Sequence, residues 1–320
     1  MPLEDFIIAV LCCVEEMWHE SPASSRLRQR GFPPKLSDSE VLTMEIVGEF
    51  LGFDADQHIW KYFRSHWRHW FPALGSRSTF ARQAANLWYI KQLLHQQLAR
   101  KLGAYNNPVH IIDGFPVPIC RFVRANRSQV FRGIAAYGYC ASKDETYKGF
   151  HGHVIIDWSG AITGLIFTAA NVDERVSMFD ILDDINGLLI GDKGYISEEL
   201  KVYLRDYMGI ELQTPLRSNM KDDRDPAFVK QLMRVRRLIE TVIGQLSEQF
   251  HIEKVRARDL WHLTSRTARK VLAHTVGVFL NRQLGRAYAV AFWRMDSSAW
   301  DVTLARKRFC FPSVDFRERW

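Results

Sequence analysis

The sequence predicts an α/β protein in which a helical N-terminal region precedes a domain with a mixed β-sheet. Residues 1–104 carry apolar side chains at helical spacing, whereas short β-rich runs begin near residue 108. From there the order is three strands, helix, strand, helix, strand and helix. Strands that alternate with helices in this way indicate a sheet covered by helices.

The helical region is expected to contain three helices. One begins after Ser37, because Ser37 and Glu40 have the spacing of a capping box. A second begins near residue 54, and a third covers residues 76–102. The second helix mixes aromatic with basic residues, which fits either contact with DNA or the two faces of an amphipathic helix.

Turn residues and helix caps divide the α/β region into short elements. Asp113-Gly114 is a turn signal after the first strand, and Ser159-Gly160 is the expected turn between the next two. Strands are expected at residues 109–113, 153–158, 161–169, 188–190 and 210–214. Helices are expected at residues 176–185, 197–207, 227–250 and 260–285.

Composition limits the class of protein. Apolar residues make up 47% of the chain and charged residues 25%, as in soluble globular proteins. The longest apolar run near the start, Phe6–Val14, is shorter than the roughly 20 residues of a membrane-spanning helix. The five cysteines show no CxxC spacing, which favours a reducing cytoplasm and argues against a structural zinc site.

Positive charge is concentrated in the last third of the sequence. Residues 221–320 contain 20 basic and 11 acidic residues, whereas residues 101–220 contain 12 basic and 14 acidic residues. A basic segment of this kind indicates a polyanion such as nucleic acid, or a solvated surface with excess charge.

Three carboxylates stand where polar side chains are unexpected. Asp113 ends the first strand, Asp192 follows an apolar strand, and Glu240 lies between apolar residues in a helix. Converging carboxylates suit Mg²⁺, which prefers oxygen ligands. Each also has a structural explanation: the two aspartates in turns, and the glutamate in a pair with Arg236 or Arg237. Other acidic residues compete for the same roles, namely Asp157, Asp173 and Glu174.

Two further features of the α/β region have alternative explanations. Gly244 lies one turn after Glu240 inside a helix, where glycine costs about 1 kcal/mol relative to alanine. It fits either the close approach of DNA or another chain, or a tight packing partner. His151 and His153 share one strand face, and we expect them to be structural because the carboxylates suit Mg²⁺ better.

Seven segments of this region carry distinctive motifs: Val109–Pro118, Phe131–Gly133, Ala136–Tyr139, Lys148–His153, Asn171–Arg175, Gly191–Tyr195 and Arg236–Leu246. In this order they resemble bacterial insertion-sequence transposases of the DDE class, most closely the family numbered nine-eight-two. The likeness extends from about residue 3 to about residue 286. It implies a ribonuclease H-like catalytic fold.

The resemblance also implies a chemistry. It selects Asp113, Asp192 and Glu240 as the catalytic and metal-binding residues from among the competing acids. They would hold two Mg²⁺ ions, for which Mn²⁺ may substitute, with Asp113 bridging both. A metal-bound water would cut the DNA strand at the transposon end, and the freed 3′-OH would then attack target DNA. No covalent intermediate with the enzyme is needed.

Basic residues around this site are expected to contact DNA. Arg236 fits a Tyr-Arg-Glu-Lys signature of related transposases, although Met233 and Ser247 replace its tyrosine and lysine. A second candidate cluster (Arg121, Arg124, Arg127, Arg132) follows the first strand, and an exposed hairpin is its alternative explanation. The residues selected for DNA binding are Arg132, Lys193, Arg236, Arg237, Lys254 and Arg256.

The expected organisation has three parts. Residues 1–104 bind DNA ends, residues 105–286 form the catalytic domain, and residues 287–320 are an unassigned tail, for which an altered reading frame is one hypothesis. The protein is expected to be a bacterial transposase that cuts DNA at terminal inverted repeats and joins the ends to target DNA. It is expected to act as a homodimer on double-stranded DNA. Its expected location is the cytoplasm, in association with the nucleoid. The alternatives are a related nuclease without joining activity and a catalytically silent DNA-binding protein.

Overall fold

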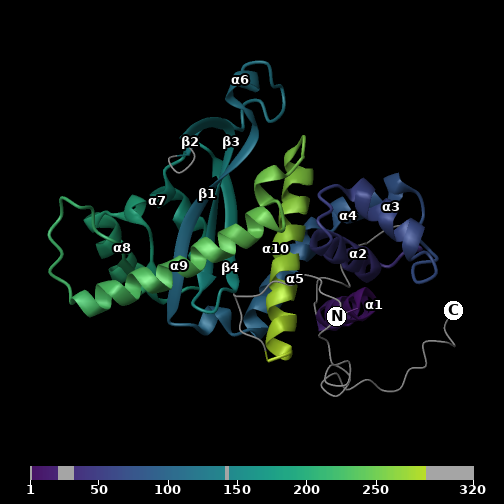
Figure 1. The fold of residues 1–320 in the computed structure, drawn as a ribbon, viewed down its shortest axis with the longest axis horizontal. Coiled ribbons are helices and arrows are strands. Elements are labelled where there is room, and N and C mark those ends of the chain that lie inside the picture. The colour runs from purple at the N-terminus through teal and green to yellow at the C-terminus, as the bar shows by residue number, and fades with distance from the viewer. Residues whose placement is uncertain (1, 21–31, 141–143, 286–320) are drawn as a thin grey trace.

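The computed structural model describes residues 2–20, 32–140 and 144–285 of the 320-residue chain (Figure 1). The tail expected at residues 287–320 lies outside these described residues. No helix within them is both long enough and apolar enough to span a membrane.

The chain begins with a group of helices. A capping box starts α2 as expected, because Ser37 accepts a bond from the backbone of Glu40 and the Glu40 carboxylate accepts one from the backbone of Ser37. The single helix expected at residues 76–102 is divided at Leu87, whose ψ of 9° is not helical. The helices are α1 (Leu3–Glu20), α2 (Asp38–Phe50), α3 (Asp56–His66), α4 (Arg77–Asn86) and α5 (Trp88–Lys101).

A curled mixed sheet follows. Its strand order is β2-β3-β1-β5-β6, and β4 pairs with β3. β1 is antiparallel to β3 and parallel to β5, which is in turn parallel to β6. The strands are β1 (Val109–Arg121), β2 (Ala136–Cys140), β3 (Glu145–Asp157), β4 (Ile162–Ala169), β5 (Gly187–Ile190) and β6 (Ile210–Gln213).

The first strand is longer than expected, so the assignment of a turn at Asp113-Gly114 was wrong. Gly114 pairs with His153 inside the sheet, and buried Phe115 and Val117 continue the strand beyond it. Apolar alternation therefore overrides the local turn preference of this dipeptide. The helix expected at 176–185 is also shorter, since α7 (Glu174–Ser177) is followed by the 3₁₀ turn η3 (Met178–Ile181).

The two faces of the sheet bury different clusters. Consecutive strand residues point to opposite faces, so Ile111 and Ile112 join separate groups of apolar side chains. The cluster containing Ile112 includes residues of α8 (Glu198–Met208) and the 3₁₀ turn η4 (Lys193–Tyr195). The cluster containing Ile111 is larger and continues through α9 (Pro226–Glu248) and α10 (Leu260–Gln283) into the N-terminal helices.

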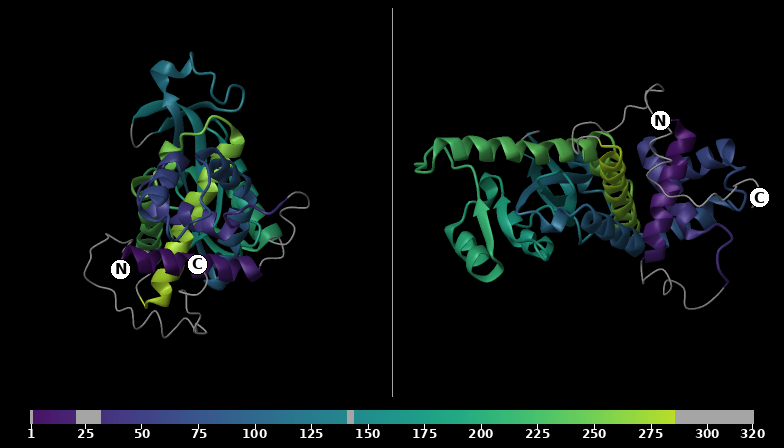
Figure 2. Two further views of the ribbon diagram at one scale, coloured as in Figure 1. Left: turned by 90° about the vertical axis from the view of Figure 1, so that its right-hand side faces the viewer. Right: turned by 90° about the horizontal axis from the view of Figure 1, so that it is seen from below.

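The last helix connects the two parts of the fold. α10 packs against α5 and α2, and Figures 1 and 2 show it between the N-terminal helices and the sheet. Buried ion pairs accompany this packing: Arg269 contacts Glu49 at 2.5 Å and Asp56 at 2.6 Å, and Lys270 contacts Glu49 at 2.8 Å. Because charges are costly to bury without partners, these pairs require α10 and α2 to keep their relative positions.

Candidate active site

Two of the selected carboxylates are positioned by adjacent parallel strands, one within β1 and the other just after β5. The register pairs Ile111 of β1 with Ile190 of β5. Asp113 lies two residues after Ile111 in β1. Asp192 lies two residues after Ile190, where it follows β5 and caps η4. The parallel register therefore brings these aspartates to neighbouring positions at the centre of the sheet.

The third carboxylate reaches the same place from α9, through an arginine. Arg236 lies with its Nη2 3.6 Å from Oδ2 of Asp113 and 3.6 Å from Oδ2 of Asp192. Its Nη1 lies 3.0 Å from Oε1 of Glu240, one turn along the helix. Glu240 therefore pairs with Arg236, and the structure gathers the three carboxylates around one guanidinium group.

The electrostatics of Asp113 reflect this convergence. Burial raises its pKa to about 6, and the negative charges of Asp192 and Glu240 act in the same direction. The backbone N–H of Gly114 and the guanidinium of Arg236 oppose the increase. The site thus holds more negative charge than its own arginine balances, a situation that favours binding of further cations.

A fourth acidic residue, Glu174, also lies here. It is the first residue of α7, and its Oε1 lies 3.3 Å from Nε2 of His151. Burial raises the pKa of Glu174 to about 7, and Asp192 and Asp113 add to the increase. Sequence reasoning named Glu174 only as a competitor, because nothing local distinguishes it from its neighbour Asp173.

The other two competing acids have structural partners. Asp157 accepts hydrogen bonds from Asn107 at 2.7 Å and from the backbone of Ala161 at 2.8 Å, where it closes the turn between β3 and β4. Asp173 caps α7 and contacts Arg175 at 2.6 Å, which lowers its pKa to about 2. Neither carboxylate shows a contact with Arg236.

The two histidines of β3 stack on one another with ring centroids 4.8 Å apart. His153 is fully buried, and its Nε2 lies 2.9 Å from Oγ1 of Thr168. Burial, with a contribution from His151, lowers the pKa of His153 to about 4. His153 therefore has a packing environment, whereas His151 faces Glu174 at the edge of the carboxylate group.

No set of three or more His, Cys, Asp and Glu side chains in the described part of the chain is arranged to hold a metal ion directly. At the carboxylates, the guanidinium of Arg236 supplies the positive charge between the three acids. The donors themselves are carboxylate oxygens, which is the chemistry that Mg²⁺ and Mn²⁺ prefer.

The basic residues selected for DNA binding do not all lie together. Arg236 is at the carboxylates, and Lys193 directly follows Asp192. Arg132 is on the segment between β1 and β2, which includes α6 (Phe122–Ala125) and projects beyond the sheet (Figure 1). Lys193, Arg132, Arg237, Lys254 and Arg256 are all exposed.

Gly244 has open space beside it. A Cβ atom added there would meet nothing within 4 Å. The alternative of a tight packing partner is therefore wrong for the described residues, and the close approach of DNA or another chain stays a prediction.

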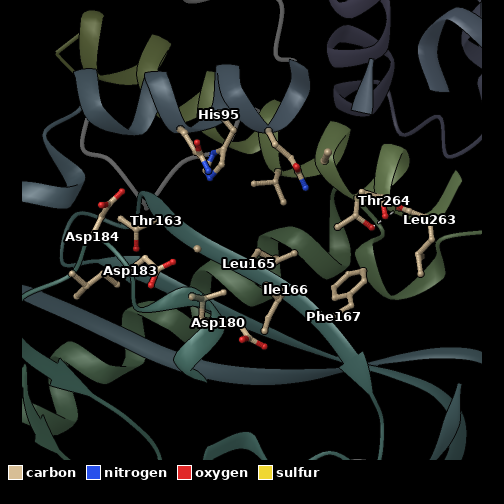
Figure 3. A pocket seen from close by; sticks show the side chains of 18 of the residues that line it. His95, Thr163, Leu165, Ile166, Phe167, Asp180, Asp183, Asp184, Leu263 and Thr264 are labelled. Carbon is tan, nitrogen blue, oxygen red and sulfur yellow. Dashed lines mark hydrogen bonds between the residues drawn. The ribbon is translucent and has the colours of Figure 1, made fainter. Parts of the chain in front are cut away.

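A separate pocket of about 450 Å³ lies between α5, α10, β4 and η3 (Figure 3). Leu165 and Phe167 form part of its lining, with His95 on one side and Asp180 on another. The residues that line this pocket do not include Asp113, Asp192 or Glu240. We therefore do not assign this pocket to the carboxylate site.

The mixed α/β fold and its converging carboxylates are consistent with one class of protein, the DDE transposases. Comparison with protein families supports this class, because the family described as "Transposase DDE domain" matches residues 104–260. The matched segment contains Asp113, Glu174, Asp192 and Glu240. The class implies DNA as the partner and divalent metal ions as the usual cofactors. No curated protein matches the sequence significantly.

Proposed function

We propose that the chain is a transposase of the insertion-sequence family numbered nine-eight-two, which binds the terminal inverted repeats of its element, cuts DNA there and transfers the strands to target DNA. The observation that carries this proposal is the convergence of Asp113, Asp192 and Glu240 on Arg236. The three acids come from β1, the end of β5 and α9, all within the matched DDE segment.

The topology supports a ribonuclease H-like catalytic fold. β1 lies between an antiparallel neighbour, β3, and a parallel neighbour, β5, and α9 packs against β1. In the proposed organisation, residues 105–286 carry the chemistry and residues 1–104 bind the DNA ends. A homodimer would hold two ends, in the bacterial cytoplasm and in association with the nucleoid.

The acidic residues suit two Mg²⁺ ions, for which Mn²⁺ would substitute. Asp113, Asp192 and Glu240 would hold them, because three carboxylates against the single charge of Arg236 leave an excess of negative charge that such ions would balance. When bound, divalent cations supply an activated water and stabilise the leaving oxygen in phosphodiester chemistry.

The chain's own basic groups would position the DNA. Arg236, already beside the carboxylates, would bind the phosphate to be cut. Lys193 would contact a neighbouring phosphate from the loop after β5. The exposed residues Arg132, Arg237, Lys254 and Arg256 would hold the rest of the duplex, without reading its sequence.

The proposal is tested by cleavage and strand transfer on a duplex that carries the terminal repeat of the element. We expect Asp113→Asn, Asp192→Asn and Glu240→Gln to lose cleavage by more than about a hundredfold, since even residues behind metal ligands contribute about 10- to 100-fold. DNA binding should survive. The control is Glu199→Gln, at an exposed acid on α8.

The outcome separates the proposed function from its alternatives. Joined products from the wild-type protein would support a transposase, and cutting without joining would indicate a nuclease. DNA binding without cutting in either Mg²⁺ or Mn²⁺ would indicate a catalytically silent DNA-binding protein. Equal cleavage by wild type and Glu240→Gln would show that Glu240 is not the third acid.

A further inference from the structure

We propose that Glu174 is a fourth carboxylate of the acidic site, which binds a divalent cation together with Asp192 and is held in place by His151. The inference deepens the proposed function and rests on it. It assigns a metal ligand that lies outside the three acids selected from the sequence.

The position of Glu174 depends on the packing of α7. This short helix follows β4 and contacts η4, the turn that Asp192 caps. Residue 173 supplies the cap of α7, so the start of the helix does not require the Glu174 carboxylate. The carboxylate of Glu174 lies instead beside Gly114 and Gly194, the glycines that follow Asp113 and Asp192.

Gly194 lies between two carboxylates, one of them that of Glu174. A Cβ atom at Gly194 would lie 3.0 Å from Oε2 of Glu174 and 3.2 Å from Oδ1 of Asp192. The two oxygens are therefore at most about 6 Å apart, on either side of a position that would be crowded for any residue larger than glycine. A Mg²⁺ ion requires oxygens about 2.1 Å away, so a small approach of both side chains would let both oxygens bind one ion, with water completing its shell.

Gly114 leaves room for the imidazole of His151, which contacts Glu174. A Cβ atom at Gly114 would lie only 2.2 Å from Nε2 of His151 and 3.2 Å from Oε1 of Glu174. This Nε2 is buried and has no hydrogen-bond partner among the described residues. It lies 3.3 Å from Oε1, so a small rotation would let an Nε2–H donate to that oxygen and leave Oε2 facing Asp192.

The charges lead to the same assignment. Within the described chain, the ion-pair contact of Glu174 is to His151, and no lysine or arginine contact accompanies it. Asp113, Asp192, Glu240 and Glu174 carry four formal negative charges, against the single charge of Arg236. The four carboxylates and Arg236 together have a net formal charge of −3, which favours the binding of divalent cations.

The test measures Mn²⁺ binding to the full-length protein without DNA, by calorimetry or electron paramagnetic resonance. We expect Glu174→Gln to weaken Mn²⁺ binding by about 10- to 100-fold while the melting temperature stays near that of wild type. Glu174→Asp should recover part of the loss. The matched control is Asp173→Asn, which should bind Mn²⁺ as wild type does, because asparagine is an equally good helix cap.

A second variant tests the position between the two carboxylates. Gly194 does not have a positive φ, so Gly194→Ala is compatible with its backbone. The added methyl group would crowd both oxygens and push the two carboxylates apart, so Mn²⁺ binding should fall by roughly tenfold or more. His151→Phe should reduce binding less, because it removes the group behind the ligand and leaves the carboxylate.

The results distinguish this inference from the proposed function. Wild-type Mn²⁺ affinity in Glu174→Gln, together with loss in Asp113→Asn, would overturn the role of Glu174 and leave the proposed function standing. Loss in both variants, with Asp173→Asn unchanged, would support both proposals. If the wild-type protein binds no Mn²⁺, with or without terminal-repeat DNA, both proposals fail.

Discussion

The guanidinium group of Arg236, on α9, lies 3.6 Å from the Asp113 carboxylate on the central strand. The same group contacts Asp192 and Glu240, so one cation offsets the repulsion among three acids. An internal cation at this position has two consequences. It stabilises the carboxylates when no other cation is present, and it competes with any cation that binds them.

The first prediction concerns this competition. Arg236→Gln should strengthen Mn²⁺ binding to the DNA-free protein by roughly fivefold, about 1 kcal/mol, because the competing charge is removed. The same variant should cut terminal-repeat DNA more slowly if Arg236 binds phosphate. Calorimetric titration and a cleavage assay measure the two effects.

Arg237→Gln is the matched control, since Arg237 is exposed on the same helix. It should leave Mn²⁺ affinity unchanged. Weaker Mn²⁺ binding in Arg236→Gln than in the control would show that the arginine supports the cation site and does not compete with it.

Local sequence patterns predicted part of this site. The apolar runs before Asp113 and Asp192 identified β1 and β5. The choice of these acids over their competitors came from the family resemblance. Pattern alone ended β1 at Gly114, because Asp-Gly is a turn signal and its pairing with His153 depends on the distant strand β3.

The surroundings of Glu174 were beyond sequence reasoning for the same physical reason. Its neighbours His151 and Asp192 come from β3 and the end of β5, and their approach depends on strand register and on the packing of α7. The alternating histidines indicated only a shared strand face. One sequence signal could have drawn attention to the site: Gly114 and Gly194 closely follow the two selected aspartates.

The second prediction concerns Gly244, inside α9. Gly244→Ala should raise the free energy of unfolding by up to about 1 kcal/mol, because a Cβ there meets nothing within 4 Å and alanine favours the helix. Urea unfolding followed by tryptophan fluorescence measures this change. Weaker DNA binding by the same variant would support close approach of DNA at this glycine.

Gly48→Ala is the contrasting variant, in the interior of α2. Its Cβ would lie 2.6 Å from Cγ1 of Ile59, so crowding should outweigh the gain in helix preference and cost about 1–3 kcal/mol. If Gly244→Ala destabilised the protein as much as Gly48→Ala, the space beside Gly244 would not be open in solution.

The third prediction concerns the buried ion pairs of α10. Arg269→Met should lower the free energy of unfolding by about 3–5 kcal/mol, because it removes one of the two cations that pair with each of the buried acids Glu49 and Asp56. Arg205→Met, at an exposed pair with Asp206 on α8, should cost less than about 1 kcal/mol. Equal losses in urea unfolding would contradict a structural role for the buried pairs.

The fourth prediction concerns the pH dependence of stability. Burial lowers the pKa of His95 to about 4, whereas an unfolded histidine titrates near 6.5. The unfolded chain therefore binds the proton first, and the stability associated with a neutral His95 is complete above about pH 6.5 and is lost as the pH falls toward 4. Between pH 6.5 and 5.5 the loss is roughly 1 kcal/mol.

His95→Gln isolates this contribution from other titrating groups. Its loss of stability between pH 6.5 and 5.5 should be smaller than that of wild type by roughly 1 kcal/mol. His58→Gln, at an exposed histidine, is the control and should follow the wild-type profile. A His95→Gln profile parallel to that of wild type would mean that His95 is not buried as a neutral group.

The fifth prediction concerns DNA binding by exposed basic residues. Lys254 lies in the 3₁₀ turn η5 (Ile252–Lys254), which packs against β1, and Arg256 follows it closely; both side chains are exposed. Each phosphate contact releases about 0.9 counterion from duplex DNA, so Lys254→Ala with Arg256→Ala should reduce the slope of log K against log salt by about 2. Lys221→Ala, at an exposed loop position outside the selected set, should leave the slope unchanged. A double variant that bound more weakly at every salt concentration with an unaltered slope would show that these residues act through the fold and not by contact with phosphate.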